Sequence, residues 1–247
     1  MSLWFFTLPA VLFVLSMYIL LPYLRTLGLS EYMSYCWALI SVLVLMLVAA
    51  VIAYRIEGQP LTWAALAERF RLRAMTRQDW LWTGGLFLFM LVSYSVMLGA
   101  GRWLIARNWI PLPSYIPAMI DPRQSMSVDA MKGLLGGQVH GQWSLVIVTL
   151  LLLFFNIVGE EFWWRGYILP RQELAMGKYT WLVHGVLWTL FHGFKYWDWL
   201  ALLPLCLGIA FVAQRRQNTW PGFITHLLLN GASALGIILL VITGGPP

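Results

Sequence analysis

Charged residues are scarce in this chain of 247 residues: Asp, Glu, Lys and Arg together make up 11% of it, whereas hydrophobic residues make up 60%. Cysteine is also rare, because the sequence has only Cys36 and Cys206, each within an apolar run. These shortages exclude a disulfide framework and a cysteine-based metal site. The mean hydropathy of +0.74 and the lack of a polar tract long enough for a soluble domain indicate a membrane protein.

Uncharged apolar runs recur along the whole chain. They cover residues 1–24, 32–54, 80–101, 133–159, 179–194, 199–214 and 217–247. A helix needs about 20 apolar residues to cross the hydrocarbon core, and the runs at 179–194 and 199–214 are short for this purpose. Because backbone groups in lipid must be satisfied within the helix, the sequence predicts an all-α, polytopic transmembrane helix bundle of about seven to eight spans.

The basic residues are divided unevenly between the two ends of the predicted spans. If the loops after the second and fourth spans and before the last span lie inside, ten Lys and Arg are inside and six are outside. Basic residues concentrate on the cytoplasmic side, so seven spans predict a cytoplasmic N-terminus and an outer C-terminus. An eighth short helix within 102–142 would invert the second half. The net charge of +6 favours contact with anionic lipid, and no nucleic acid partner is expected.

Two loops organise the chain. Residues 55–79 include a stretch at 61–70 with helix-like apolar spacing, which predicts an amphipathic helix on the membrane surface. Residues 102–142 are rich in proline and glycine and are expected to form a non-cytoplasmic loop or a partly re-entrant segment. The chain therefore divides into residues 1–142, which hold N-terminal spans and both loops, and residues 143–247, a four-helix half that carries the chemistry.

Residues 160–166 read EEFWWRG and follow a long uncharged run. On a helix, Glu161 and Arg165 are one turn apart in the order that favours an ion pair, whereas Glu160 faces elsewhere without an evident local partner. Carboxylates near a bilayer are costly, and a partly desolvated carboxylate is a suitable general base. The alternative is that both glutamates are interfacial charges that flank Arg165.

Polar side chains also interrupt two later apolar runs. His192 lies in a short span, and His226 and Asn230 are one helical turn apart, on one face. Each could instead be a hydrogen-bonded core residue that ties helices together. From a rise of about 1.5 Å per residue, these groups and Glu160 reach depths at which they could line one cavity open toward the cytoplasmic side. His184 is expected to be structural.

These elements occur in a characteristic order: Glu160-Glu161-x-x-x-Arg165, then Trp188-x-x-x-His192, then His226-x-x-x-Asn230. In this order they resemble the CPBP (Abi) family of intramembrane proteases, which includes type II CAAX prenyl endopeptidases and bacteriocin-processing or immunity proteins. The resemblance covers roughly residues 143–242. Trp188 is a departure, since the family usually has phenylalanine there, and Trp164 likewise replaces a frequent phenylalanine.

The resemblance implies an intramembrane endopeptidase. Glu160 would activate water with help from His192, His226 and Asn230 would stabilise the oxyanion, and Glu161 and Arg165 would hold the first motif in position. Family members are often called metalloproteases, so a divalent metal such as zinc on Glu160, His192 and His226 is the alternative to the favoured metal-free mechanism. The implied partners are the lipid bilayer and a peptide or protein substrate, with prenylated proteins among the candidates.

Two other functions compete with the protease. A non-catalytic membrane scaffold or regulator of the same fold would act through its helix surfaces and would have no need of His226 and Asn230 together. A proton-coupled transporter would be expected to have carboxylates at mid-membrane and repeated halves, and neither is evident. A complete set of catalytic groups favours the enzyme.

Overall fold

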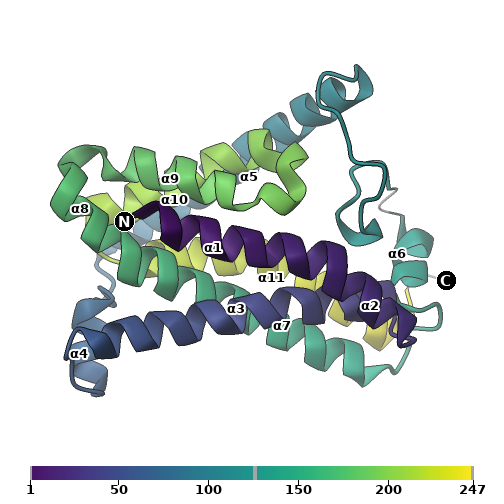
Figure 1. Ribbon diagram of the computed structural model, residues 1–247, viewed down its shortest axis with the longest axis horizontal. Coiled ribbons are helices and arrows are strands. Elements are labelled where there is room, and N and C mark those ends of the chain that lie inside the picture. The colour runs from purple at the N-terminus through teal and green to yellow at the C-terminus, as the bar shows by residue number, and fades with distance from the viewer. Residues whose placement is uncertain (1, 125–126, 246–247) are drawn as a thin grey trace.

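A computed structural model of the chain describes residues 2–124 and 127–245, and these form helices and connecting loops without a β-strand. The helices lie side by side as a bundle, with the N- and C-termini at opposite ends (Figure 1). α3 (Glu31–Ile56) packs on α7 (Trp143–Glu161), and α7 packs on α11 (Trp220–Thr243). α10 (Trp199–Arg216) packs on α9 (Thr180–Phe191), on α11 and on α5 (Arg77–Ala106). The predicted all-α fold is confirmed.

The remaining elements extend or connect these helices. The first helical stretch consists of α1 (Ser2–Leu15), a π-helical segment η1 (Ser16–Leu20) and α2 (Leu21–Thr26). The others are α4 (Trp63–Arg69), α5 (Arg77–Ala106), α6 (Val128–Leu135), the π-helical η3 (Phe162–Ile168), α8 (Leu169–Met176) and the 3₁₀ turns η2 (Ala118–Ile120), η4 (Gly177–Tyr179) and η5 (Gly193–Asp198). Side chains of Ser30, Thr62 and Thr76 cap α3, α4 and α5, so polar residues at the ends of apolar runs fix where helices begin.

Six helical stretches of the described residues are long and apolar enough to cross a membrane. They are Leu3–Thr26, Glu31–Ile56, Arg77–Ala106, Trp143–Phe191, Gly193–Arg216 and Trp220–Thr243. The fourth has 49 residues, more than twice the length that one crossing needs. The chain reverses at α8, so that α9 runs back toward the end at which α7 begins (Figure 1). The seven apolar runs of the sequence therefore correspond to these six stretches, with two runs in the fourth.

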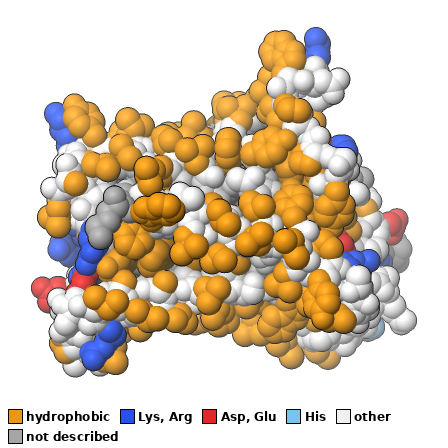
Figure 2. All heavy atoms as spheres, viewed as in Figure 1, with side chains coloured by type: hydrophobic (Ala, Val, Ile, Leu, Met, Phe, Trp, Pro, Cys, Tyr) orange, Lys and Arg blue, Asp and Glu red, His pale blue; other side chains and the backbone are white. Residues whose placement is uncertain are grey.

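The outer surface agrees with a membrane location. Hydrophobic side chains cover the middle of the face in Figure 2, and charged side chains gather at its two ends. Strongly exposed apolar residues on the helices include Trp4, Leu81, Leu88 and Val92. An apolar belt between two charged ends is the surface that a bilayer-spanning bundle requires.

The loop at 55–79 contains the predicted surface helix in a shorter form. α4 covers Trp63–Arg69, and Trp63 is exposed, whereas the adjoining Phe70 is fully buried. The Phe70 carbonyl accepts a hydrogen bond from the hydroxyl of Thr219 at 2.7 Å. The surface helix is therefore joined to the start of α11 through its last turn, which the amphipathic pattern does not reveal.

A charged cluster fixes the same loop to α8. The Arg69 side chain donates to both carboxylate oxygens of Glu57, at 2.6 and 2.8 Å, and Arg171 also donates to Glu57. Both guanidinium groups lie over the ring of Tyr167, 5.1 and 4.5 Å from its centre. The hydrogen bonds from Arg69, with a smaller contribution from Arg171, lower the pKa of Glu57 although partial burial opposes the shift.

This cluster predicts an acid-sensitive contribution to stability. The native state favours the ionised Glu57, so the contribution is complete above the pKa of Glu57 in the unfolded chain and is lost as the pH falls through the lowered native pKa. In detergent micelles at pH 7, the native protein should have a higher melting temperature than Glu57→Gln. The difference between the two melting temperatures should disappear in acid. Glu68→Gln, which changes an exposed carboxylate, should show no difference at either pH. A pH-independent difference for Glu57→Gln would contradict the assignment.

The loop at 102–142 begins later than predicted, because α5 continues to Ala106. Its buried residues Leu135 and Val139 pack against Cys36 and Ile40 of α3, Val148 of α7 and Val241 of α11. The loop thus covers the end of the bundle at which α3 and α7 begin and α11 ends. In Figure 1, α6 lies at this end beside the C-terminus.

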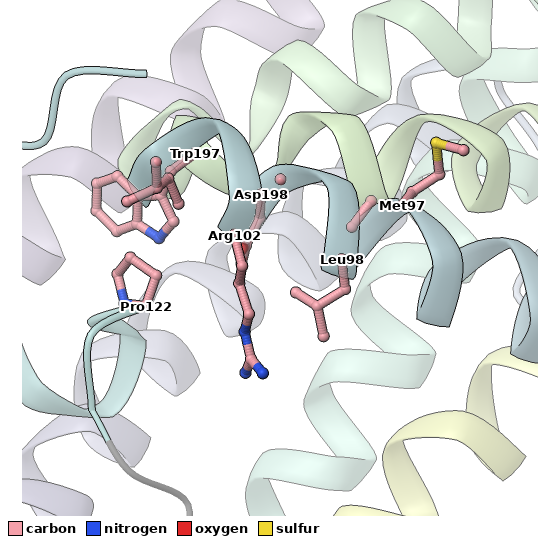
Figure 3. A pocket seen from close by; sticks show the side chains of 9 residues that line it. Met97, Leu98, Arg102, Pro122, Trp197 and Asp198 are labelled. Carbon is pink, nitrogen blue, oxygen red and sulfur yellow. The ribbon is translucent and has the colours of Figure 1, made fainter. Parts of the chain in front are cut away.

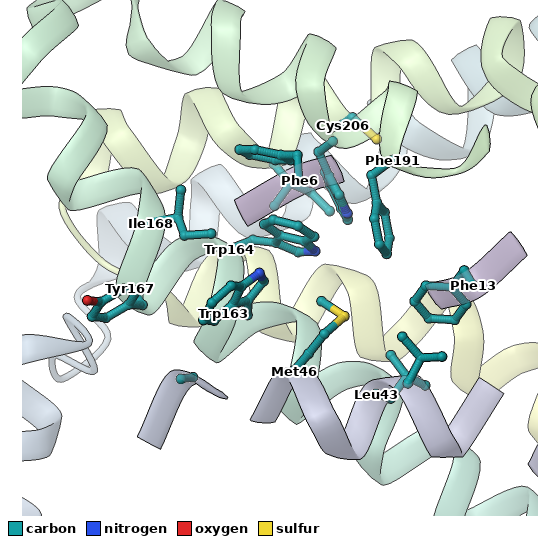
Figure 4. Packing of buried hydrophobic residues seen from close by; sticks show 14 of the residues in the cluster. Phe6, Phe13, Leu43, Met46, Trp163, Trp164, Tyr167, Ile168, Phe191 and Cys206 are labelled. Atoms are coloured by element: carbon teal, nitrogen blue, oxygen red, sulfur yellow. The ribbon is translucent and has the colours of Figure 1, made fainter. Parts of the chain in front are cut away.

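Aromatic rings fill the interior where α1 meets the second half of the chain. Trp164 stacks on Phe6 of α1 with ring centres 4.5 Å apart, and it meets Phe191 edge to face at 5.0 Å. Figure 4 shows these rings packed together with Met46 of α3 and Cys206 of α10. The N-terminal helices therefore form one wall of the interior that the later helices share.

Helices α9 and α10 approach each other closely at a glycine. At Gly185 of α9, an added Cβ would lie 2.8 Å from the Leu207 Cα of α10. We expect Gly185→Ala to lower the free energy of unfolding by about 1–3 kcal/mol, since the α10 backbone must move to admit the methyl group. Gly84→Ala in α5 is the matched control, because no atom lies within 4 Å of its added Cβ. Thermal unfolding that affects both variants equally would contradict the prediction.

Candidate active site

The candidate site begins where α7 changes its winding. α7 ends at Glu161, and residues 162–168 continue it as the π-helical η3. Such wide turns inside helices occur often at functional sites. Here the π turn follows directly after the two glutamates, and all its residues except Phe162 are buried. Both carboxylates thus lie within the bundle, with Glu160 only 4% exposed and Glu161 fully buried.

Glu161 binds two cationic or ionisable partners. Its Oε1 lies 3.2 Å from a guanidinium nitrogen of Arg165, as the four-residue spacing predicts. The same oxygen is 2.9 Å from Nδ1 of His226 in α11. Since a carboxylate oxygen accepts, Nδ1 of His226 is the protonated nitrogen in this contact. Glu161 therefore joins α7 to α11, a link that the sequence does not indicate.

Glu160 is held by two neutral donors. The amide of Asn156, one turn earlier in α7, donates to Oε1 at 2.9 Å. The indole N–H of Trp188 in α9 donates to Oε2 at 3.0 Å. The expectation that Glu160 lacks a local partner is therefore wrong, because the relevant partner precedes it by four residues. A buried carboxylate with both oxygens hydrogen-bonded is fixed in orientation and points away from lipid.

Asn156 also connects the carboxylate to the last helix. Its amide oxygen accepts a hydrogen bond from the Asn230 side chain at 2.5 Å. An amide nitrogen has two hydrogens, so Asn230 keeps a second N–H for another acceptor. A continuous path of hydrogen bonds thus runs from Asn230 through Asn156 to Glu160.

His192 ends α9 and lies beside the same tryptophan. Its Nδ1 is 2.9 Å from the Trp188 carbonyl oxygen, which can only accept, so Nδ1 carries the proton and Nε2 is left for another partner. The rings of His192 and His226 each have their centres 6.0 Å from that of Trp188. Both histidines are partly exposed, unlike the carboxylates. Trp188 is thus the common neighbour of Glu160, His192 and His226.

Arg165 completes the cluster without a hydrogen bond. It is fully buried, and none of its side-chain nitrogens has a hydrogen-bond partner among the described residues. Its charge is balanced by Glu161, and its guanidinium carbon lies 3.4 Å from the centre of the Trp188 ring. A cation on the face of an indole is attracted by the ring quadrupole. The arginine is therefore stabilised by one ion pair and one aromatic face.

The structure brings together all six residues that the sequence singled out, through the contacts of Glu160, Glu161, Arg165, His192, His226 and Asn230 with one another or with shared neighbours. Sequence reasoning missed Asn156, although its position four residues before Glu160 places both on one helix face. His184 lies elsewhere: it is fully buried and bonded to Gln172 at 2.6 Å.

The three-ligand metal alternative, with Glu160, His192 and His226 as ligands, stays a prediction. Both oxygens of Glu160 accept hydrogen bonds from Asn156 and Trp188, and His226 is bound to Glu161 through Nδ1. Within residues 2–124 and 127–245, no three His, Cys, Asp or Glu side chains gather closely enough to hold a metal ion. His192 and His226 both use Nδ1 in their contacts, so Nε2 of each is left for a water molecule or a metal ion.

Two surface hollows lie away from this cluster. One is lined by α5 and η5, including Arg102, Trp197 and Asp198, together with Pro122 (Figure 3). The other lies at the opposite end of the bundle, beside Glu57 and Arg171. Neither is lined by a residue of the buried cluster.

The geometry defines a class of site: a carboxylate, two histidines and an asparagine enclosed by transmembrane-type helices. Residues 142–232 match the family model described as type II CAAX prenyl endopeptidase Rce1-like, and this segment contains the whole cluster. This places residues 142–232 in the CAAX protease (CPBP) family and confirms the resemblance found in the sequence. No curated protein and no solved structure matches the chain.

Proposed function

We propose that this protein is an intramembrane endopeptidase that hydrolyses a peptide bond in a membrane-associated or lipidated substrate. The observation that supports this most strongly is the Glu160 carboxylate, which is buried and fixed by Asn156 and Trp188 beside two histidines. A carboxylate held in this way has lost most of its water shell without gaining a cation of its own, which leaves it available as a base.

In the proposed reaction, Glu160 takes a proton from a water molecule while the water oxygen attacks the scissile carbonyl carbon. Nε2 of His192, which is not used in the bond to Trp188, accepts a hydrogen bond from the same water and orients it. The carbonyl oxygen becomes an oxyanion. When the tetrahedral intermediate collapses, the C–N bond breaks and the protonated Glu160 returns the proton to the leaving amine.

The oxyanion would be stabilised by His226 and Asn230. His226 uses Nδ1–H toward Glu161, so it can donate from Nε2 only as the doubly protonated imidazolium. The Glu161 carboxylate, which also faces Arg165, would share its negative charge with this imidazolium. Asn230 contributes the N–H that is not bonded to Asn156. Removal of one such donor typically costs 10²–10³-fold in rate.

The substrate class follows from the family and the surroundings. The matching family is described as a CAAX prenyl endopeptidase, and the cluster lies within an apolar bundle, so a farnesylated peptide in lipid vesicles is a suitable probe. Purified protein in H₂¹⁸O should release a fragment with one ¹⁸O in its new carboxylate, detected by mass spectrometry. A mock preparation without the chain controls for contaminating peptidases. No cleavage of lipidated or unlipidated peptides would favour the scaffold alternative.

We also propose that the site opens toward the cytoplasm. Glu160 is the second-to-last residue of α7, and Arg171 follows it at the bundle end where most basic residues lie. Both native cysteines are buried, so introduced cysteines can be labelled selectively. In intact cells, a membrane-impermeant maleimide should label Trp109→Cys at the other end and leave Leu174→Cys unlabelled until the membrane is opened. The reverse pattern would overturn the orientation.

A further inference from the structure

Trp188 occupies the centre of the cluster although it has no acid–base chemistry of its own. Its side chain is 3% exposed, and its indole N–H donates to Oε2 of Glu160 at 3.0 Å. Its ring face carries the guanidinium of Arg165 at 3.4 Å. Its backbone carbonyl binds Nδ1 of His192. One residue thus contacts the base, the buried cation and the water-orienting histidine.

The contact between Trp188 and Arg165 affects the contact between Trp188 and Glu160. The guanidinium lacks hydrogen-bond acceptors among the described residues, so the indole face is one of its two sources of compensation. A cation over the ring draws electron density from the indole and makes its N–H a stronger donor. The charge of Arg165 can therefore act on Glu160 through the ring, without a direct ion pair that would neutralise the base.

We propose that Trp188 is a positioning residue for Glu160: its indole N–H fixes the carboxylate for attack on water, and its ring transmits the charge of Arg165. A phenylalanine at this position could cover Arg165 but could not donate to Glu160. This assignment rests on the proposed peptidase function for its kinetic consequences. The contact between the two side chains does not depend on turnover.

The kinetic test removes the donor and keeps the ring. Trp188→Phe lacks the N–H, and 3-benzothienylalanine at position 188 replaces only the N–H by sulfur in a ring of the same shape. A hydrogen bond to a charged group is worth about 10- to 100-fold. Both variants should lose about this factor in kcat for a farnesylated peptide, with KM unchanged. The matched control is Trp163→Phe, which removes a buried indole N–H bonded to the Phe5 carbonyl at 3.4 Å.

The outcomes separate the possible roles. If both variants keep kcat within twofold of the native value, the positioning role is overturned. If only Trp188→Phe loses activity, the ring matters and the N–H does not, which also overturns the assignment. If Trp163→Phe loses as much as the Trp188 variants, the effect is one of general packing and the proposal fails.

A second measurement does not require activity. Thermal unfolding of native protein, Trp188→Phe, Glu160→Leu and the double variant forms a double-mutant cycle. We expect the double variant to lose less melting temperature than the sum of the single losses. If the losses of melting temperature in the two single variants simply add in the double variant, the proposed contact between Trp188 and Glu160 is overturned. If native protein cleaves no peptide while the cycle shows coupling, the proposed function fails and the Trp188–Glu160 contact stands, so the two failures are distinguishable.

Discussion

Glu160→Gln should lower peptide cleavage by about 10²–10⁴-fold, the usual contribution of a positioned general base. The carboxamide has nearly the same shape, but it cannot take a proton from water. Its NH₂ group must also face either Asn156 or Trp188, both of which donate to the native carboxylate. The rate is measured with a farnesylated peptide under saturating conditions, so that the effect is assigned to kcat.

Two controls accompany this variant. Glu68→Gln makes the same chemical change on the exposed face of α4 and should cleave at the native rate. Thermal unfolding should show that Glu160→Gln remains folded, with a loss limited to about 1–3 kcal/mol for the mismatched donor. Cleavage by Glu160→Gln within tenfold of the native rate would exclude Glu160 as the base.

Arg165→Met is expected to have the largest effect on stability, a loss of about 3–5 kcal/mol. The change leaves Glu161 fully buried without the cation at 3.2 Å, and it uncovers the face of Trp188. Methionine fills part of the volume but carries no charge. Unfolding in detergent micelles should therefore show a much lower melting temperature.

The origin of this loss can be tested by removing the other charge. Glu161→Gln combined with Arg165→Met should be less destabilised than the sum of the single variants, because no lone charge remains buried. Arg123→Met breaks an ion pair with Asp121 in which the arginine is exposed, so it should destabilise the protein far less than Arg165→Met. If Arg165→Met unfolds no more readily than Arg123→Met, the buried ion pair does not stabilise the fold as described.

The sequence predicts helices well because long apolar runs in lipid permit few other structures. It also predicts the pairing of Glu161 with Arg165, since one turn of helix separates them. The sequence does not predict the contacts between helices. That Trp188 donates to Glu160, and that His226 binds Glu161 and not Glu160, depend on how α7, α9 and α11 rotate about their axes. Apolar runs with weak periodicity do not specify that rotation.

The π-helical segment is the second feature that sequence patterns could not supply. A period of 3.6 residues predicts the positions after Glu161 as a continuous α-helix, whereas η3 widens the winding over residues 162–168. Residues 160–165 contain no proline or glycine to signal the change. Its cause is tertiary: Trp163, Trp164 and Tyr167 are buried against rings from α1 and against one another.

The close approach of α3 to α7 bears on which part of this chain can work independently. An added Cβ at Gly159, next to Glu160, would lie 2.8 Å from the Leu43 carbonyl oxygen, and Phe6 covers Trp164. The segment that matches the protease family is therefore not a self-sufficient module, because its innermost surface is completed by residues encoded about 115 to 160 positions earlier. Without these early helices, the later half would expose Gly159 and Trp164 to lipid or water in place of a protein wall.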